Sequence, residues 1–187
     1  MVEAAVHQLA AFGMRGLTHR KVEGRAGVSQ GSVKYHFGSL DGLIEAVLRY
    51  MVEVDSATVM QVSPEVVRQA QESGSIPESL WRQAREAYEA TMGHPELSLA
   101  RFELVLHVAR HPELTSILRD ARNELVRTTA ASIHGPDPEG GARLVLALMD
   151  GLLLHQLSAR ESIVDESAAV LMLAAANAAL QLPPRVE

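Results

Sequence analysis

Apolar residues recur every three or four positions along most of this chain, which is the period of an amphipathic helix. The first run covers residues 2–12 and stops at Gly13, and a longer one begins after Ser39 and extends toward Pro64. A loop of small and polar residues is predicted at 72–77. Beyond it, the same period predicts helices at about 78–92, 95–110, 112–134, 139–160 and 165–181. The pattern therefore favours a protein built from packed helices.

Two shorter helices are predicted between residues 18 and 35. Thr18 is a suitable N-cap for a helix that runs to Ala26 and ends at Gly27. Ser29 is a suitable cap for a second helix that runs through Tyr35. Small apolar contacts between these helices are expected from Val22, Ala26, Val28 and Val33. Two short helices joined by a glycine-containing turn are the geometry of a helix-turn-helix.

The last two predicted helices differ from the others in being apolar on almost every side. Residues 144–154 read LVLALMDGLLL, and residues 168–180 are mostly alanine with a few larger apolar residues. A helix that is apolar all round is covered on several sides, either by its own chain or by a partner. We expect these helices to form a homodimer seam. The residues expected in that seam are Leu148, Leu152, His155, Val170, Leu173 and Asn177.

The composition narrows the class of protein. Hydrophobic residues make up 47% of the 187 positions and aromatic residues only 4%, so alanine and leucine dominate, as in helical proteins. Cysteine is absent, which excludes disulfides and thiol chemistry. There is no signal-peptide pattern, and the longest apolar runs fall short of the roughly 20 residues of a membrane span. We expect a soluble, cytoplasmic protein.

The charge is distributed unevenly along the chain. The formal net charge is −6, but the segment from Arg15 to His36 contains five lysines and arginines and one acid, a net +4. The remainder therefore carries −10. A basic segment in an acidic chain suggests a polyanionic partner, and the alternative is a solvated helix face on which basic residues cluster by chance.

The residue types of this segment suit DNA. The second short helix would present Gln30, Gly31 and Ser32 at its start, where a helix in the major groove meets base edges. Gln30 can pair with an adenine edge, and Arg20 with guanine or phosphate.

Residues 2–48 resemble the DNA-binding domain of the TetR family of bacterial transcriptional regulators. The matching residues are Glu3–Val6, Gly13, Gly16–Val22, Arg25–Gly31, Tyr35–Phe37, Ser39, Leu43 and Val47. The resemblance implies an all-α protein, with a helix-turn-helix DNA-binding domain at 1–45 and an effector-binding and dimerisation domain at 46–187. It also implies a homodimeric repressor that a small molecule releases from operator DNA.

The family's DNA contacts carry over to Thr18, His19, Arg20, Gln30, Gly31, Ser32, Lys34, Tyr35 and His36. Three positions depart from the family pattern. Lys34 stands where tyrosine is usual, so it would replace a hydrogen bond to phosphate with an ion pair. Leu40 replaces the lysine that usually begins the fourth helix, and no basic arm precedes the first helix. Glu23 stands where alanine is common, and we expect it on a less crowded edge of its helix.

Effector-binding residues are expected between the helices of the larger domain, where helix bundles open pockets. The candidates are Trp81, Tyr88, Met92, Phe102, Leu106, His107 and Met149. Each of these is also a typical core residue. Glu103, His107 and His111 have a spacing that could align metal ligands, but His111 directly precedes Pro112 and no partner ligands are evident. We therefore expect neither a metal nor a cofactor.

Two other functions were considered. The chain contains no nucleophile elbow, P-loop, GxGxxG or HExxH motif, so we do not expect an enzyme. The second alternative is an interaction module of the same fold whose DNA binding is weakened or lost, as Leu40 and the missing basic arm suggest.

Overall fold

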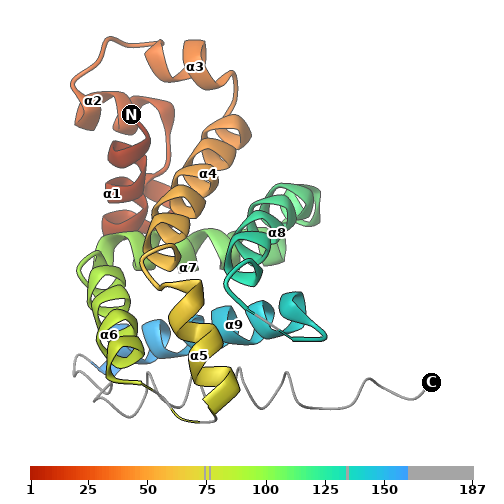
Figure 1. The fold of residues 1–187 in the computed structure, drawn as a ribbon. Coiled ribbons are helices and arrows are strands. Elements are labelled where there is room, and N and C mark those ends of the chain that lie inside the picture. The colour runs from red at the N-terminus through yellow and green to blue at the C-terminus, as the bar shows by residue number, and fades with distance from the viewer. Residues whose placement is uncertain (74, 76, 134, 160–187) are drawn as a thin grey trace. The chain divides into compact units, whose positions relative to one another are not determined.

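The structure, a computed structural model, describes residues 1–73, 75, 77–133 and 135–159, and within that part of the chain it contains helices and no strands (Figure 1). The α-helices are α1 Val2–Phe12, α2 His19–Ala26, α3 Ser32–Phe37, α4 Leu40–Val59, α5 Pro64–Ser73, α6 Glu78–Met92, α7 Pro95–Arg110, α8 Thr115–Ala130 and α9 Pro138–Ala159. Two short 3₁₀ helices complete the set, η1 at Gly13–Gly16 and η2 at Pro112–Leu114. The predicted all-α fold is confirmed.

Most predicted helices lie where the hydrophobic period places them, and the differences have local causes. α5 was not predicted, since no element was assigned between Pro64 and the loop expected at 72–77. The predicted helix at 112–134 begins as the 3₁₀ turn η2 and ends at Ala130. Proline lacks the N–H that a continuing helix would need, so α7 stops at Arg110 and the chain starts again at Pro112. The helix predicted at 165–181 lies outside the described residues.

The chain divides into two compact units. The first contains Met1–Val54 and His94–Asn123, and the second contains Asp55–Gly93 and the described residues from Glu124 onward. α4 and α8 each begin in the first unit and end in the second. These compact units are defined by contacts and differ from the predicted functional domains at 1–45 and 46–187. The functional division stays a prediction.

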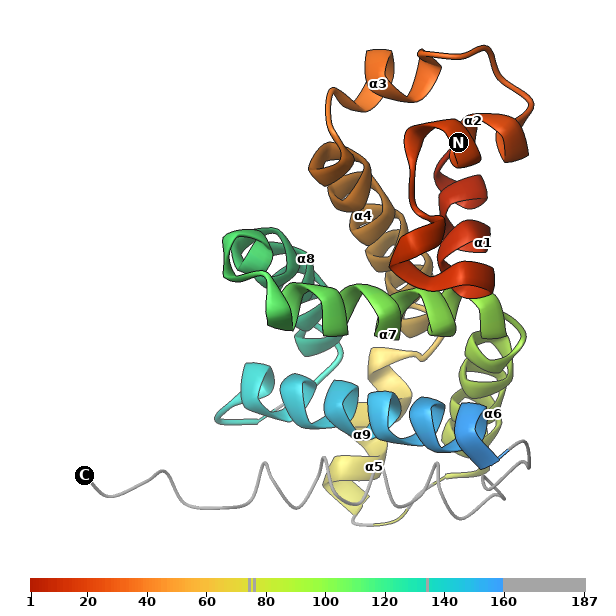
Figure 2. The same ribbon diagram turned by 180° about the vertical axis from the view of Figure 1, so that it is seen from behind.

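One continuous apolar core holds the first unit together. Leu9 of α1, Val22 of α2, Val33 of α3 and Val47 of α4 are completely buried in it, together with Leu104 of α7. α1 packs against α7, so that a helix from a distant part of the chain completes the core of the N-terminal helices (Figures 1 and 2). Fully burying a side chain of this size stabilises a fold by about 1.5–3 kcal/mol. The N-terminal helices therefore depend on α7.

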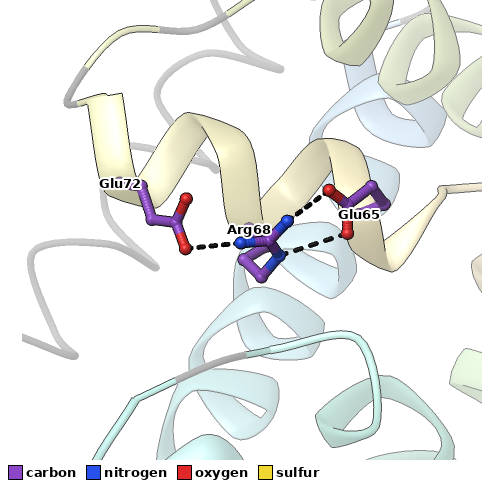
Figure 3. Close-up of polar contacts among 3 residues, drawn as sticks. All are labelled: Glu65, Arg68 and Glu72. Carbon is purple, nitrogen blue, oxygen red and sulfur yellow. Dashed lines mark hydrogen bonds and ion pairs between the residues drawn. The ribbon is translucent and has the colours of Figure 1, made fainter.

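The second unit contains a smaller apolar cluster around Val126, Ala142 and Leu146, and polar contacts also join its helices. Ser63, just before α5, donates its backbone N–H to Gln83 Oε1 of α6 at 2.8 Å. The hydroxyl of Tyr88 donates to Gln156 of α9, and burial raises the pKa of that hydroxyl. On the surface of α5, Arg68 binds carboxylates on both sides, one turn before it and one turn after it (Figure 3).

The described chain leaves much of α9 uncovered. Within this 22-residue helix only Gly141, Ala142, Leu146 and Leu153 are buried, and Leu154 is 54% exposed. Among the described helices, α9 is also the one whose length and mean hydropathy would allow it to cross a membrane. Core and interface helices of soluble proteins share that property. His155, which we expect in the dimer seam, is exposed within this chain.

His107 and His111 stack at the end of α7. Their ring centroids lie 4.1 Å apart. Burial lowers the pKa of His107 below its usual value of 6.5, and the charge of a protonated His111 lowers it further. Asp41 and Glu113 oppose that shift. The pKa of His107 is therefore lowered on balance, which favours the neutral ring.

Two glycines of the helix-turn-helix provide a matched test of backbone conformation. A Cβ would meet nothing within 4 Å at either Gly24, inside α2, or Gly27, but Gly27 has φ 66°. We expect Gly24→Ala to stabilise the protein by about 0.5–1 kcal/mol, because alanine is the better helix former. Gly27→Ala should destabilise it by about 1 kcal/mol, since a side chain disfavours the left-handed region. Urea unfolding without DNA measures both, and shifts in the same direction would contradict the assignment.

His107 should make the protein sensitive to mild acid. Because its pKa is lowered in the folded state, the unfolded chain binds a proton at His107 more readily than the folded chain as the pH falls below about 6.5. Stability is therefore present above that pH and is lost below it. Between pH 7.5 and 5.5, we expect the melting temperature of His107→Gln to fall less than that of the wild type. His94→Gln, at an exposed site, serves as the control. Parallel melting curves for wild type and His107→Gln would refute the expectation.

Candidate nucleic-acid interface

A side-chain cap begins α2, and two left-handed glycines shape the turn between α2 and α3. Thr18 caps α2 as predicted, its Oγ1 accepting the Lys21 backbone N–H at 3.4 Å. Gly27, with φ 66°, ends α2, and Gly31, with φ 92°, immediately precedes α3. Such positive φ values are open to glycine at little cost. The local sequence thus determines a sharp turn and a short second helix.

The second short helix begins two residues later than predicted. α3 begins at Ser32, and Ser29 does not cap it. The hydroxyl of Ser29 lies 3.0 Å from that of Ser32, and its carbonyl accepts the Ser32 N–H in a turn. The left-handed conformation of Gly31 prevents the helix from extending backward through Gln30. Gln30 and Gly31 therefore lie in the turn before α3, and both are exposed.

The predicted DNA contacts share an accessible surface. Exposed residues among them are Thr18, Arg20, Gln30, Gly31, Lys34, Tyr35 and His36, while His19 and Ser32 are half-buried. Tyr35 is 86% exposed, which is unusual for an aromatic side chain, and its ring contacts that of His36 edge-on. The predicted DNA contacts run from the cap of α2 through the turn to α3 (Figure 1). Their role in binding DNA stays a prediction.

The apolar contacts between the two helices were predicted correctly except for one. Val22 and Val33 are completely buried, and Ala26 packs against the same core. Val28 was expected to face inward but is 37% exposed. It directly follows the left-handed Gly27, where the chain turns away from the core.

Of the five basic residues of the segment, Lys21 of α2 is engaged, whereas the three others on α2 and α3 are not. Lys21 Nζ donates to the Arg15 carbonyl at 2.9 Å and lies 5.9 Å from the centre of the Phe12 ring. Arg20, Arg25 and Lys34 are exposed and form no ion pair with any described residue. These three cations are available to a polyanion.

α4 follows α3 through a tight connection. Ser39 Oγ accepts the Gly42 backbone N–H at 3.1 Å, which confirms the helix start expected at Ser39. A side chain at Gly42 would collide with the Phe37 carbonyl. Leu40, which replaces the family's usual lysine, is 36% exposed. The end of α3 is therefore held close to the start of α4.

Glu23 is the residue that the sequence reasoning placed wrongly. It is only 5% exposed, and its Oε1 accepts the backbone N–H groups of Gly31 at 2.9 Å and Val33 at 3.1 Å. The partners are eight and ten residues away, beyond any local spacing rule. A clue was available in the sequence, because Glu23 is the one acid in a basic segment.

The predicted effector residues are divided between the two units. Phe102, Leu106 and His107 belong to the first, and Trp81, Tyr88 and Met149 to the second, while the side chain of Met92 lies outside the described residues. A cavity of about 390 Å³ in the first unit is lined by His107 together with Phe12, Gly13, Met14, Arg15, Glu103 and Arg110. Tyr88 is buried, Leu106 is exposed, and Trp81, Phe102 and Met149 are half-buried. The effector site stays a prediction.

The predicted dimer residues lie partly within the described chain. Leu148 and Leu152 of α9 are half-buried and His155 is exposed. Val170, Leu173 and Asn177 lie outside the described residues. Among the residues that the structure describes, no three His, Asp or Glu side chains are grouped as metal ligands.

Comparison with known proteins covers both ends of the chain. Residues 1–47 match the model of the bacterial regulatory proteins of the tetR family, and residues 77–181 match that of the tetracyclin repressor-like C-terminal domain. The HTH-type transcriptional regulator BetI of Paraburkholderia phytofirmans is 36% identical over 52 residues, 28% of this chain. That match spans 27% of the length of BetI.

Solved structures of similar fold cover nearly the whole chain. A TetR family member from Streptomyces coelicolor A3 has a TM-score of 0.71 and 28% identity, with 94% of each chain covered. The multidrug binding protein EbrR, solved with ethidium, has a TM-score of 0.66 and 28% identity, again with 94% of each chain covered. A TetR family regulator from Rhodococcus has a TM-score of 0.69 and 25% identity, with 96% of each chain covered. With the C-terminal model alone matching more than half of its residues, this chain belongs to the TetR family of bacterial regulatory proteins.

Proposed function

We propose that this protein is a DNA-binding transcriptional repressor that a small-molecule effector releases from its operator. The observation that carries the proposal is the α2–turn–α3 surface, where three unpaired cations surround an exposed recognition segment. TetR family regulators are non-enzymatic transcription factors, and this function requires no catalytic group. Because the partner is chromosomal DNA, the protein would work in the cytoplasm.

The proposed contacts sort by chemistry. Arg20, Arg25 and Lys34 would bind phosphates, which supply affinity without sequence preference. Gln30, at the turn into α3, would read a base edge in the major groove, where glutamine pairs best with adenine. The exposed Tyr35 would add a hydrogen bond to the backbone. Residues 1–45 would thus form the DNA-binding domain, which the family model over 1–47 supports.

A homodimer would complete the DNA-binding unit. Helix-turn-helix dimers place two recognition helices in successive major grooves about 34–36 Å apart. The half-buried apolar side chains of α9, with Leu154 exposed, provide a surface that a second copy could cover. A symmetric pair of α9 helices is the simplest way to cover it.

The effector would act through residues 46–187, and α7 is positioned to pass its effect on. The similarity to EbrR, which was solved with ethidium, supports a small organic effector. α7 lies within the region that the C-terminal model matches, and it packs against α1 in the core of the first unit. A ligand that binds one position of α7 more tightly than another would therefore shift α1 and the recognition helix with it.

The alternative function is an interaction module of the same fold that binds DNA weakly or not at all, which Leu40 favours. Salt separates the two functions. A regulator that binds through phosphates loses affinity steeply as salt rises, because bound counterions are released. Binding to promoter-region DNA that is undetectable or insensitive to salt would favour the module.

Lys34 and Gln30 should differ in kind when replaced by alanine. Lys34→Ala should weaken binding to all duplexes alike and reduce the slope of log affinity against log salt by about 1. Gln30→Ala should change the preferred base at one position and leave the slope unchanged. Arg82→Ala on α6 removes the same charge outside this segment and serves as the control. Selection from a random duplex pool at two salt concentrations measures both effects. An unchanged slope for Lys34→Ala would show that Lys34 does not contact phosphate.

Leu148→Glu and Leu152→Glu should convert the dimer to monomer. Each would place a charge in an apolar interface, and an unpaired buried charge is strongly unfavourable. Light scattering with size-exclusion chromatography gives the mass, for which the chain weighs 20.2 kDa. Arg82→Glu on α6 is the control. Variants that stay dimeric with unchanged melting temperature would place the seam elsewhere.

A further inference from the structure

Glu23 is a buried acid in the segment that otherwise carries the positive charges. Its side chain is 5% exposed, although a carboxylate removed from water is unfavourable unless its oxygens accept hydrogen bonds. Its charge also opposes the approach of phosphate. Attraction to DNA therefore cannot explain this residue, and its hydrogen bonds can.

Glu23 of α2 accepts hydrogen bonds from backbone N–H groups along the connection to α3. The backbone carbonyl of Glu23 accepts the N–H of Gly27 and, at 3.2 Å, that of Val28. Its Oε1 accepts the N–H of Gly31 at 2.9 Å and that of Val33 at 3.1 Å. Four backbone donors, four to ten residues further along, thus converge on Glu23.

α3 has little else to fix its start. It contains six residues, far too few for a helix to be stable by itself. Gly31, its N-cap, has no side chain that could accept the free N–H groups of the first turn. The carboxylate of Glu23 supplies that acceptor from a neighbouring helix, through hydrogen bonds that a charged partner strengthens.

We infer that Glu23 is a positioning residue that fixes the recognition helix against α2 and so determines its sequence specificity. The alanine that is common at this position in the family could not make these bonds. Replacing Glu23 frees the start of α3, which bears Ser32 and follows Gln30, while the cations of α2 keep their places. Discrimination between DNA sequences is then lost before general affinity for DNA.

Three substitutions separate the hydrogen bonds from the charge. Glu23→Gln keeps the acceptor oxygen at the same reach and removes the charge, whereas Glu23→Asp keeps the charge and is one methylene too short. Glu23→Ala removes both. Glu3→Gln, at an exposed acid in the first turn of α1, controls for the loss of one negative charge.

The first measurement is amide hydrogen exchange in the DNA-free, full-length protein. We expect the Gly31 and Val33 amides to exchange at least about tenfold faster in Glu23→Asp and Glu23→Ala, because in both variants these amides lose their hydrogen-bond acceptor. Glu23→Gln and Glu3→Gln should resemble the wild type. The Val47 amide, in the core of the same unit, reports overall folding. Unchanged protection of Gly31 and Val33 in Glu23→Asp and Glu23→Ala overturns the inference.

The second measurement rests on the proposed DNA-binding function. The probes are a 30-base-pair duplex enriched by the wild-type protein from a random pool, and poly(dI-dC) as non-specific competitor. Affinity for the enriched duplex should fall about tenfold or more in Glu23→Asp and Glu23→Ala, while affinity for poly(dI-dC) is undiminished. Glu23→Gln should keep the wild-type ratio between the two.

The outcomes distinguish a positioning role from a merely stabilising one. Equal losses on both DNA probes, in proportion to the folded fraction, would make Glu23 a stabilising residue only and overturn the inference. If Glu23→Ala does not fold, the comparison of Glu23→Asp with Glu23→Gln still decides whether the length of the side chain or its charge matters. If the wild type enriches no duplex, the proposed function fails, and the exchange measurement alone decides whether Glu23 holds α3.

Discussion

The burial of α1 against α7 is the contact on which the first unit depends. Leu9 and its apolar neighbours on α1 meet Ala100 and Leu104 of α7 in a core that excludes water almost completely. The short helices α2 and α3 have few apolar residues of their own, chiefly Val22 and Val33, and both point into this core. Eight- and six-residue helices are not stable alone, so the core that α1 and α7 create gives them their positions.

In the proposed function, the same contact would link recognition to regulation. α1 belongs to the segment that the DNA-binding family model matches, and α7 to the segment that the C-terminal model matches. A close-packed core transmits displacement because its side chains cannot be compressed. A change in the position of α7 is therefore a change in the support of the recognition segment.

Glu23 adds a second, polar constraint to that apolar one. The core decides which faces of α2 and α3 turn inward, and the carboxylate decides where α3 begins. The two left-handed glycines, Gly27 and Gly31, let the backbone satisfy the apolar packing and the hydrogen bonds to Glu23 at the same time. Outside this anchored part, the unpaired cations and the exposed Tyr35 remain free to meet a partner.

The helices, the turn and the charged face could be predicted from the sequence, because they depend on residues within a few positions of one another. The 3.6-residue period, the cap at Thr18 and the glycine at 27 were enough to place α1, α2, α6, α7 and α9. Contacts between residues far apart in the sequence depend instead on the tertiary structure. It placed Glu23 against the amides of Gly31 and Val33, turned Val28 outward, and started α3 at Ser32. Hydrogen bonds between residues eight to ten apart, and the packing of α1 against a helix from a distant part of the chain, leave no periodic pattern in the sequence.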